Sequence, residues 1–254
     1  MWGIIPAAGA GTRIQPLAFS KELLPMCGRG NGAEHRPRAV SDYLVERLVR
    51  GGATRICFVI SPGKSDILEY YGASAYSAAL CYVIQPKAVG LCDSIFRALP
   101  VIDKQAPVLV GLPDTIWFPE SALSALPDNR LSFLLFPVER PANFDAVLLD
   151  DHDRVIEIQV KHPSPSTRWV WGAFKMPGLV LEELFNLWHA RQCVDEYIGT
   201  LVNAWLANGG EAYGFRIGQS YFDVGTMNGY LEAMRHLSGF DRHGTELVQE
   251  AIER

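Results

Sequence analysis

The chain has 254 residues, a formal net charge of −5, and hydrophobic residues at 48% of its positions. This charge argues against nucleic acid or an anionic membrane surface as the main partner, so any anion site must be a local concentration of positive groups. The five cysteines show no C-x-x-C spacing, which indicates neither a disulfide framework nor a zinc site. We find no charged leader and no run of eighteen apolar residues, so we expect a soluble cytoplasmic protein with no membrane partner.

Near its start the chain reads G-I-I-P-A-A-G-A-G-T-R-I-Q-P-L-A-F-S-K-E-L-L-P, an apolar run that leads into a glycine-rich loop. The loop contains Gly9, Gly11 and Thr12, and Arg13 and Lys21 follow closely. Such a loop exposes backbone N–H groups to phosphate oxygens, and glycine lets the backbone approach closely. With two cations beside it, the loop predicts a polyphosphate site, although the glycines alone would fit an ordinary turn equally well.

The next part of the chain alternates between helical spacing and β-rich apolar runs. The predicted elements are a helix over 39–49, a strand over 55–60, a helix over 61–71, a strand over 80–84, a helix over 90–99 and a strand over 107–110. Ser61 and Pro62 place the start of the second helix, because serine favours the N-cap and proline the first helical position. The alternation predicts an α/β protein with a doubly wound, Rossmann-like sheet.

The second half is richer in strands and predicts an antiparallel or mixed extension of the same sheet. The predicted strands cover 131–138, 146–149, 155–160, 169–176 and 212–217, and the predicted helices cover 177–191, 196–208, 226–237 and 245–254. The segment over 27–38 is rich in glycine and arginine and lacks apolar periodicity, so we interpret it as a flexible connection.

Two aspartates stand where a ligand site is expected. Asp114, in G-L-P-D-T, follows the predicted strand over 107–110, and open α/β sheets bind ligands at the carboxyl ends of their strands. Asp223, in Y-F-D-V-G-T, precedes the helix over 226–237. Either aspartate alone would fit a turn or an N-cap. Phosphate chemistry with a divalent cation needs phosphate donors, fixed positive charge and one or two carboxylates, and this chain offers each of them.

G-x-G-T-R-x-x-P followed by S-K-E-L-L-P resembles the sugar-1-phosphate nucleotidylyltransferases, the nucleoside diphosphate sugar pyrophosphorylases that include glucose-1-phosphate thymidylyltransferase and uridylyltransferase. The similarity runs over roughly 2–237. It implies a single GT-A-like nucleotidyltransferase domain over 1–254, with a nucleotide-binding part over 1–115, a sugar-phosphate-binding part over 116–240 and a C-terminal helix over 241–254.

The resemblance also implies a role for each residue that matches a family motif. The catalytic residues would be Arg13 and Lys21, and Asp114 and Asp223 would bind Mg²⁺. The nucleotide would be bound by Ala8, Gly9, Gly11, Thr12, Arg13, Gln85 and Gly90. The sugar phosphate would be bound by Lys161, Gly172 and Glu196.

The implied activity is the transfer of a nucleotidyl group from a nucleoside triphosphate, with dTTP or UTP favoured, to a sugar 1-phosphate. A CTP-dependent transferase with another phosphorylated acceptor stays open, and so does a regulator that binds nucleotide sugar without catalysis. A dinucleotide-binding oxidoreductase is disfavoured, because G-A-G-T-R lacks the third glycine of G-x-G-x-x-G. Relatives commonly self-associate, so a homo-oligomer is compatible with the sequence.

Three residues depart from the family's pattern around the sugar. Val160 replaces a glutamate that usually reads sugar hydroxyls, and His162 displaces a proline. Asp145 stands where the family has a small residue. These departures leave the identity of the acceptor open.

Overall fold

The computed structural model describes residues 1–27 and 37–239 of the chain. Four parallel strands form the centre of a ten-stranded sheet, in the spatial order β6-β4-β1-β7. These strands are β1 (Trp2–Pro6), β4 (Arg55–Ile60), β6 (Ala78–Ile84) and β7 (Pro107–Gly111). Numbered along the chain this order is 3-2-1-4, the Rossmann order. The first three strands are added toward one edge of the sheet, and the fourth, β7, is added on the other side of β1.

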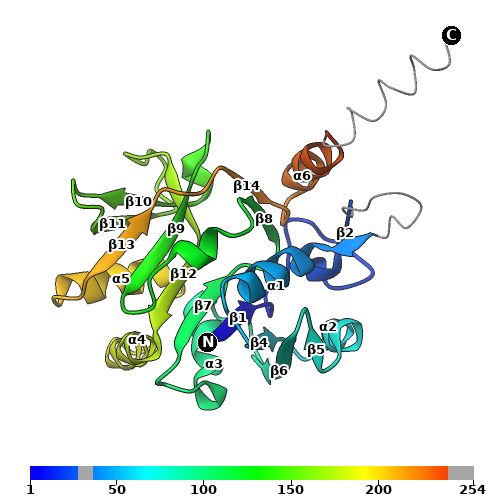
Figure 1. Cartoon of the computed structure of the whole chain (residues 1–254), viewed down its shortest axis with the longest axis horizontal. Helices are drawn as coiled ribbons and strands as arrows, with labels where there is room; N and C mark the ends of the chain where they lie inside the picture. Colours follow the sequence, from blue (N-terminus) through cyan, green and yellow to red (C-terminus); the bar gives the residue numbers. More distant parts are fainter. Residues whose placement is uncertain (28–36, 240–254) are drawn as a thin grey trace, which may run out of the picture.

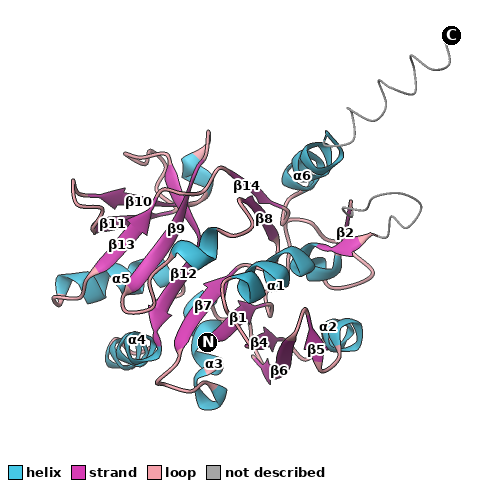
Figure 2. Cartoon of the chain, viewed as in Figure 1, coloured by secondary structure: helices cyan, strands magenta, loops and turns pink. Residues whose placement is uncertain are grey.

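The other strands extend this sheet in mixed directions, as the sequence predicts (Figure 2). β12 (Trp169–Pro177) runs antiparallel to β7 and β9, while β10 is antiparallel to both β11 and β12. The remaining strands of the sheet are β5 (Ser74–Ala75), β9 (Leu131–Pro137), β10 (Asp145–Leu149), β11 (Val155–Val160) and β13 (Ala212–Phe215).

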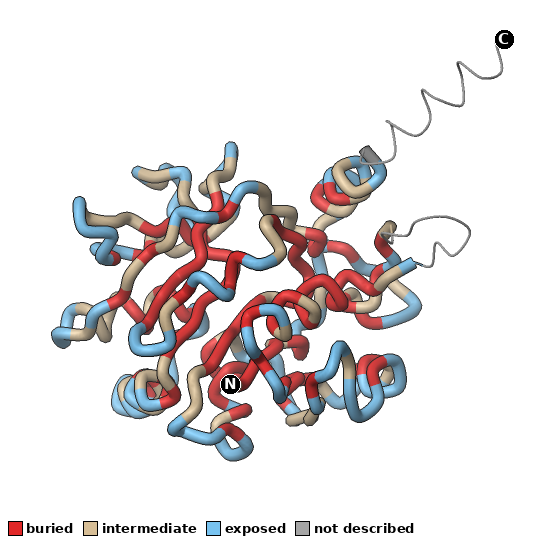
Figure 3. The backbone as a smooth tube through the Cα atoms, in the orientation of Figure 1, coloured by how far each residue is buried: buried red, intermediate tan, exposed pale blue. Residues whose placement is uncertain are grey.

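Helices cover both faces of the sheet (Figure 1). The apolar cluster on one face includes side chains of α3 (Leu91–Arg97), α4 (Gly178–Ala190) and α5 (Ile198–Ala207). The cluster on the other face includes side chains of α1 (Val40–Arg50) and α2 (Ser65–Tyr71). The strands between them are buried on both sides, which explains their continuous apolar runs (Figure 3).

Two small sheets lie outside the main one. β8 (Thr115–Phe118) pairs antiparallel with β14 (Ser220–Asp223), and β2 (Pro25–Met26) pairs with β3 (Arg38–Ala39). α6 (Met227–Gly239) follows β14 and packs beside it (Figure 1). Short 3-10 turns occur over Lys21–Leu23, Leu99–Val101, Ala122–Ala125 and Pro141–Asn143. None of these small strands was predicted.

The predicted helix start at Ser61 is wrong. Ser61 accepts a hydrogen bond from the backbone N–H of Lys64, which closes a turn, and α2 begins only at Ser65. Gly63 follows Pro62 in this turn and favours it over a helix, because glycine is a poor helix former. The helix predicted over 196–208 likewise begins later, at Ile198.

Three sequence-based predictions stay predictions. The connection over 27–38 and the C-terminal helix over 245–254 fall largely or wholly outside the described residues. The division of one domain at residue 115 stays a prediction. Among the described helices, none is both long and apolar enough to cross a membrane.

Candidate active site

A pocket of about 250 Å³ lies at the carboxyl ends of β1 and β7, where the sheet order reverses. From the first part of the chain it is lined by Gly9, Arg13, Lys21 and Asp114, among others. From the second part it is lined by Lys161 and Asp223 together with several aromatic residues. The structure thus brings six of the predicted site residues into one cavity.

The two predicted metal carboxylates meet beside Gly225. β14 pairs with β8 so that Asp223 lies opposite Thr115, and the N–H of Val224 donates to the carbonyl of Asp114 at 2.8 Å. A Cβ atom on Gly225 would lie 2.8 Å from Asp114 Oδ2 and 2.9 Å from Asp223 Oδ1. Only glycine therefore leaves both carboxylates room at this point, which gives a physical reason for the glycine in D-V-G-T.

Each carboxylate is paired with one of the predicted catalytic cations. Lys21 Nζ lies 2.5 Å from Asp114 Oδ2, and Arg13 Nη1 lies 2.9 Å from Asp223 Oδ2. Burial acts to raise the pKa of Asp114, but the Lys21 ammonium outweighs it and holds that pKa below its usual value. Burial acts to lower the pKa of Lys21, and Asp114 in turn keeps it above the usual value. Both groups are therefore charged at neutral pH.

The glycine loop packs directly on Lys21. Gly11 has a φ of 66°, and a Cβ there would lie 2.7 Å from Cδ of Lys21. A side chain at this position would be strained and would displace the lysine. Gly11 therefore leaves the space that the side chain of Lys21 occupies, in addition to any contact of the loop with phosphate.

The residues of the pocket fit a magnesium ion. Mg²⁺ prefers oxygen ligands, and it is usually bound through one or two carboxylates with water and substrate phosphates as its other ligands. Asp114 and Asp223 provide two such carboxylates at one point. Within residues 1–27 and 37–239 no group of three or more His, Cys, Asp or Glu residues could hold a metal ion by itself. A bound ion would therefore complete its shell with water and substrate oxygens.

A buried ion pair at the wall of the pocket was missed at the sequence level. Glu22 is fully buried, and Lys64 Nζ lies 2.7 Å from Glu22 Oε1 and donates to the carbonyl of Ala7 at 2.7 Å. Burial raises the pKa of Glu22 and lowers that of Lys64. The pair ties the segment after β1 and the turn before α2 to the residue next to Lys21. The only signal in the sequence is the acid that follows the lysine in S-K-E-L-L-P.

The remaining nucleotide residues surround the loop and the start of α3. Ala8 is buried under the loop and Thr12 is exposed. Gln85 is buried, and its amide nitrogen donates to Asp93 at 2.7 Å and to the carbonyl of Gly90 at 3.3 Å. Gln85 and Gly90 are not among the residues that line the pocket. Their contact with a base stays a prediction.

The predicted sugar-phosphate residues have three different environments. Lys161 lines the pocket directly after β11, with a φ of 46°, and its Nζ donates to the carbonyl of Asn143 at 3.1 Å. Gly172 lies under the ring of Tyr221, where a Cβ would be 2.6 Å from the ring, and so it makes room for this pocket residue. Glu196 has an exposed side chain, while its carbonyl accepts the backbone N–H groups of Leu91 and Cys92 at the start of α3.

A family model described as nucleotidyl transferase matches residues 2–239 of the chain. The chain belongs to the nucleotidyl transferase family. Members of this family generally depend on a divalent metal ion, which agrees with the paired carboxylates of the pocket.

Curated relatives of this nucleotidyl transferase are distant. The Bifunctional protein GlmU of Methanocaldococcus jannaschii is 23% identical over 250 residues, which cover 97% of this chain and 56% of that protein. A Glucose-1-phosphate thymidylyltransferase of Mycolicibacterium smegmatis is 24% identical over 244 residues, covering 92% of this chain and 81% of that protein. The chain spans about half the length of the GlmU proteins of Methanococcus maripaludis and Methanocaldococcus jannaschii that it matches.

Solved structures share its fold. A putative Glucose-1-Phosphate Thymidylyltransferase from Bacillus anthracis, in complex with a sucrose, has a TM-score of 0.78 at 21% identity and covers 93% of this chain and 95% of that chain. A UTP-bound UGPase from Acinetobacter baumannii has a TM-score of 0.76 at 21% identity and covers 99% and 98% of the two chains. These likenesses confirm a Rossmann-like nucleotidyltransferase fold.

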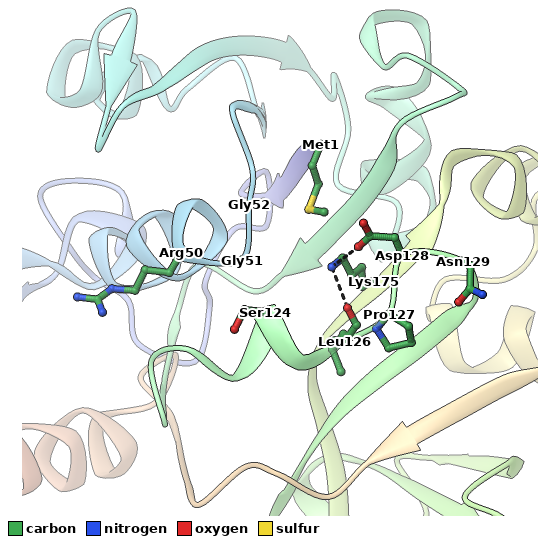
Figure 4. Close-up of a pocket in the computed structure, with 10 residues that line it drawn as sticks. All are labelled: Met1, Arg50, Gly51, Gly52, Ser124, Leu126, Pro127, Asp128, Asn129 and Lys175. Atoms are coloured by element: carbon green, nitrogen blue, oxygen red, sulfur yellow. Dashed lines mark hydrogen bonds and ion pairs between the residues drawn. The ribbon is translucent and has the colours of Figure 1, made fainter.

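A second hollow of this nucleotidyl transferase, about 580 Å³ in volume, lies near the amino end of β1 (Figure 4). Figure 4 shows Lys175 there with its amine directed at Asp128 and at the carbonyl of Leu126, which it reaches at 2.8 Å. None of the predicted site residues lines this hollow. The smaller pocket, which holds six of them, is therefore the candidate active site.

Proposed function

We propose that this chain transfers a nucleotidyl group from a nucleoside triphosphate, dTTP or UTP, to a sugar 1-phosphate in the presence of Mg²⁺. The products are a nucleoside diphosphate sugar and pyrophosphate. The observation that carries the proposal is the convergence of Asp114 and Asp223 beside Gly225, each paired with a cation from the opening motif. A nucleotide sensor would need no such pair of carboxylates.

The chemistry is an in-line displacement at the α-phosphorus. An oxygen of the sugar 1-phosphate forms the new P–O bond, and the bond from the α-phosphorus to the bridging oxygen of pyrophosphate breaks. The nucleophile is already anionic, so no general base is needed, and the difficulty lies in bringing two anions together. Asp114 and Asp223 would hold Mg²⁺, which would supply charge neutralisation for the two anionic substrates.

The protein's own cations do the rest of the work in this proposal. Lys21 would neutralise the triphosphate and the transferring group, and Arg13 would bind the departing pyrophosphate. Lys161, which also lines the pocket, would hold the attacking phosphate. Before substrate binds, Asp114 and Asp223 hold the first two cations in place. Fixed charges of this kind need no reorganisation during the reaction, and this lowers the barrier.

The choice of a pyrimidine nucleotide and a sugar 1-phosphate draws support from the names of the relatives. Glucose-1-phosphate thymidylyltransferases are among them, and one structural neighbour is described as bound to UTP. A single methyl group separates the two bases, and in a pocket it is worth only about 1 to 3 kcal/mol. Both nucleotides are therefore retained in the proposal. A cytoplasmic location and self-association stay predictions from the sequence.

The test is pyrophosphate release measured over a grid of nucleoside triphosphates and sugar 1-phosphates, with Mg²⁺ and with EDTA. We expect turnover with dTTP or UTP that disappears with EDTA. Turnover with CTP and a phosphorylated acceptor that is not a sugar would favour the CTP-dependent transferase. Nucleotide-sugar binding with no release of pyrophosphate in any combination would favour a regulator and would contradict the proposal.

A further inference from the structure

Asp145 is an acidic side chain of the pocket that the proposed reaction does not use. It is 8% exposed, lines the pocket, and accepts the backbone N–H of Lys161 at 3.2 Å. Burial raises its pKa, and the neighbouring charge of Lys161 partly opposes this shift. A buried carboxylate with one neutral hydrogen bond and one cation at 3.9 Å retains free acceptor capacity. The carboxylate is therefore available to a ligand.

The strand register shows how Asp145 differs from its cross-strand neighbour in access to the pocket. Asp145 on β10 lies directly opposite Val160 on β11, so the two side chains point to the same face of the sheet. Gly199 of α5 covers Val160, and a Cβ on that glycine would lie 2.6 Å from Val160 Cγ2. Position 160 is therefore packed under a helix, whereas its cross-strand neighbour opens into the pocket.

Trp171 adds an unsatisfied donor to the same corner. It is 6% exposed and lines the pocket, and its buried indole N–H has no hydrogen-bond partner among the residues that the structure describes. Ala146 of β10 pairs with Val170 of β12 in antiparallel register, which places Asp145 across from Trp171. The indole N–H lowers the pKa of Asp145, yet no hydrogen bond of normal geometry joins them.

We propose that Asp145 and Trp171 together bind one hydroxyl group of the acceptor and so determine its specificity. The hydroxyl would donate to the Asp145 carboxylate and accept from the indole N–H of Trp171. A hydroxyl suits this pair because it is both donor and acceptor, whereas an ammonium group has no acceptor and would leave the indole unsatisfied. This inference rests on the proposed function, since it concerns the acceptor of that reaction.

The position of Lys161 narrows the choice of hydroxyl. Its backbone N–H is bound to Asp145, and its Nζ lies 3.9 Å from the same carboxylate. If Lys161 holds the attacking phosphate, the hydroxyl bound by Asp145 lies on the part of the sugar close to that phosphate. Removal of this hydroxyl from the substrate leaves a buried acceptor and a buried donor unpaired, and this is how a polar site discriminates strongly against deoxy analogues.

The test compares α-D-glucose 1-phosphate with its 2-, 3-, 4- and 6-deoxy analogues as acceptors for wild type, Asp145→Asn and Trp171→Phe. The first variant keeps an oxygen for the Lys161 N–H and loses the charge, and the second keeps the ring and loses the N–H. Asp151→Asn and Trp169→Phe are the matched controls, since one is exposed at the far end of the β10–β11 hairpin and the other lies outside the pocket on β12. Melting temperatures check that each variant is folded.

We expect kcat/KM with the hydroxylated acceptor to fall about 10- to 100-fold for Asp145→Asn and about 3- to 10-fold for Trp171→Phe, mainly through KM. Both controls should match wild type. With one deoxy analogue, wild type should lose at least about 100-fold and the variants should no longer differ from it.

Two results would overturn the inference in different ways. Variants that lose activity equally with every acceptor, deoxy analogues included, would show a structural role and leave the proposed function intact. Wild type that turns over no acceptor with any nucleoside triphosphate would overturn the proposed function, and this inference with it.

Discussion

The charged pairs of the pocket differ in how far water reaches them. The side chain of Lys21 is 14% exposed and that of Asp114 11%, whereas the side chain of Arg13 beside Asp223 is 60% exposed. A buried charge that loses its partner is costly, because water cannot replace the partner, while an exposed pair is worth little. The two aspartates therefore contribute differently to folding, although we propose the same role for both in the reaction.

We expect Asp114→Asn and Asp223→Asn each to lower kcat by at least about 100-fold, because each removes a proposed metal ligand. Only Asp114→Asn should also lower the melting temperature measurably, since it leaves the buried Lys21 without its counter-ion. Pyrophosphate release and thermal melting measure the two effects, with Asp151→Asn as the control. A variant that keeps near-normal turnover would remove its aspartate from the metal site.

Glu22 and Lys64 should show the behaviour of a buried ion pair. Lys64→Met leaves a fully buried carboxyl without its cation, and we expect it to lower the free energy of unfolding by about 3 to 5 kcal/mol. The double variant Glu22→Gln/Lys64→Met should recover most of this loss. Urea denaturation of both variants measures the coupling. A double variant as unstable as the single one would contradict the pairing.

At the scale of elements, short segments bring the site together. β14 places Asp223 against β8 through backbone pairing, and Asp114 is the residue immediately before β8. The segment before α5 is held at the start of α3 because the carbonyl of Glu196 accepts two N–H groups of that helix. This contact depends on Gly90, which has a φ of 118° and approaches the backbone of Glu196 closely. Tyr197, the next residue, lines the pocket.

We expect Gly90→Ala to lower the free energy of unfolding by about 1 to 3 kcal/mol, from backbone strain and from displacement of the Glu196 segment. A Cβ there would lie 2.8 Å from the Cα of Glu196, so this segment and Tyr197 must shift. Gly63→Ala is the matched control, because a Cβ on Gly63 meets nothing within 4 Å. Urea denaturation compares the two, and equal stabilities would exclude the proposed contact.

At the scale of the whole molecule, the pocket is built from both predicted parts of the chain. Asp223 comes from the proposed sugar-phosphate part, yet it lies with Arg13 and Asp114 of the nucleotide part. The sheet also continues across the proposed boundary, since β7 pairs with β12. The pocket therefore takes residues from both sides of residue 115, and the functional division there stays a prediction.

Some carboxyl groups of the molecule have a raised pKa and others a lowered pKa, so they make stability depend on pH in opposite directions. Burial raises the pKa of Glu22 and Asp145. Their contribution to stability is therefore full below the unfolded pKa of about 4 and is lost as pH rises through the folded pKa. Burial acts the same way on Asp114 and Asp66, but Lys21 and Ser20 hold the pKa of these two below the usual value. Their contribution is full above the unfolded pKa and is lost as pH falls through the folded pKa.

We therefore expect the melting temperature to be highest at mildly acidic pH, to decline slightly toward neutral pH, and to fall steeply below about pH 4. Glu22→Gln should reduce the decline toward neutral pH, because it removes one group with a raised pKa. Thermal melting between pH 3 and 8 checks both statements, with the range chosen to bracket the ordinary carboxyl pKa of about 4. A melting temperature that rises steadily from acid to neutral pH would contradict the proposed balance.

The sequence by itself determined the fold class and the half of the site that lies in continuous motifs. The alternation of helices and apolar strands predicts the Rossmann-like sheet, because strands buried on both faces need unbroken apolar runs. The opening loop with Arg13 and Lys21, and Asp114 in the turn after β7, could be predicted because residue type and position after a strand are local properties. The family match over residues 2–239 agrees with both predictions.

Only the tertiary structure decided which side chains meet. The pairing of Lys64 with Glu22, the place of Gly225 between two carboxylates, and the corner formed by Asp145 and Trp171 all join residues far apart in the chain. The helix start predicted at Ser61 is wrong because the local preference of serine and proline gave way to a turn that delivers Lys64 into the interior. Local propensities are worth fractions of a kcal/mol per residue, whereas breaking a buried ion pair such as that of Lys64 with Glu22 costs several kcal/mol, so the tertiary contact outweighs them.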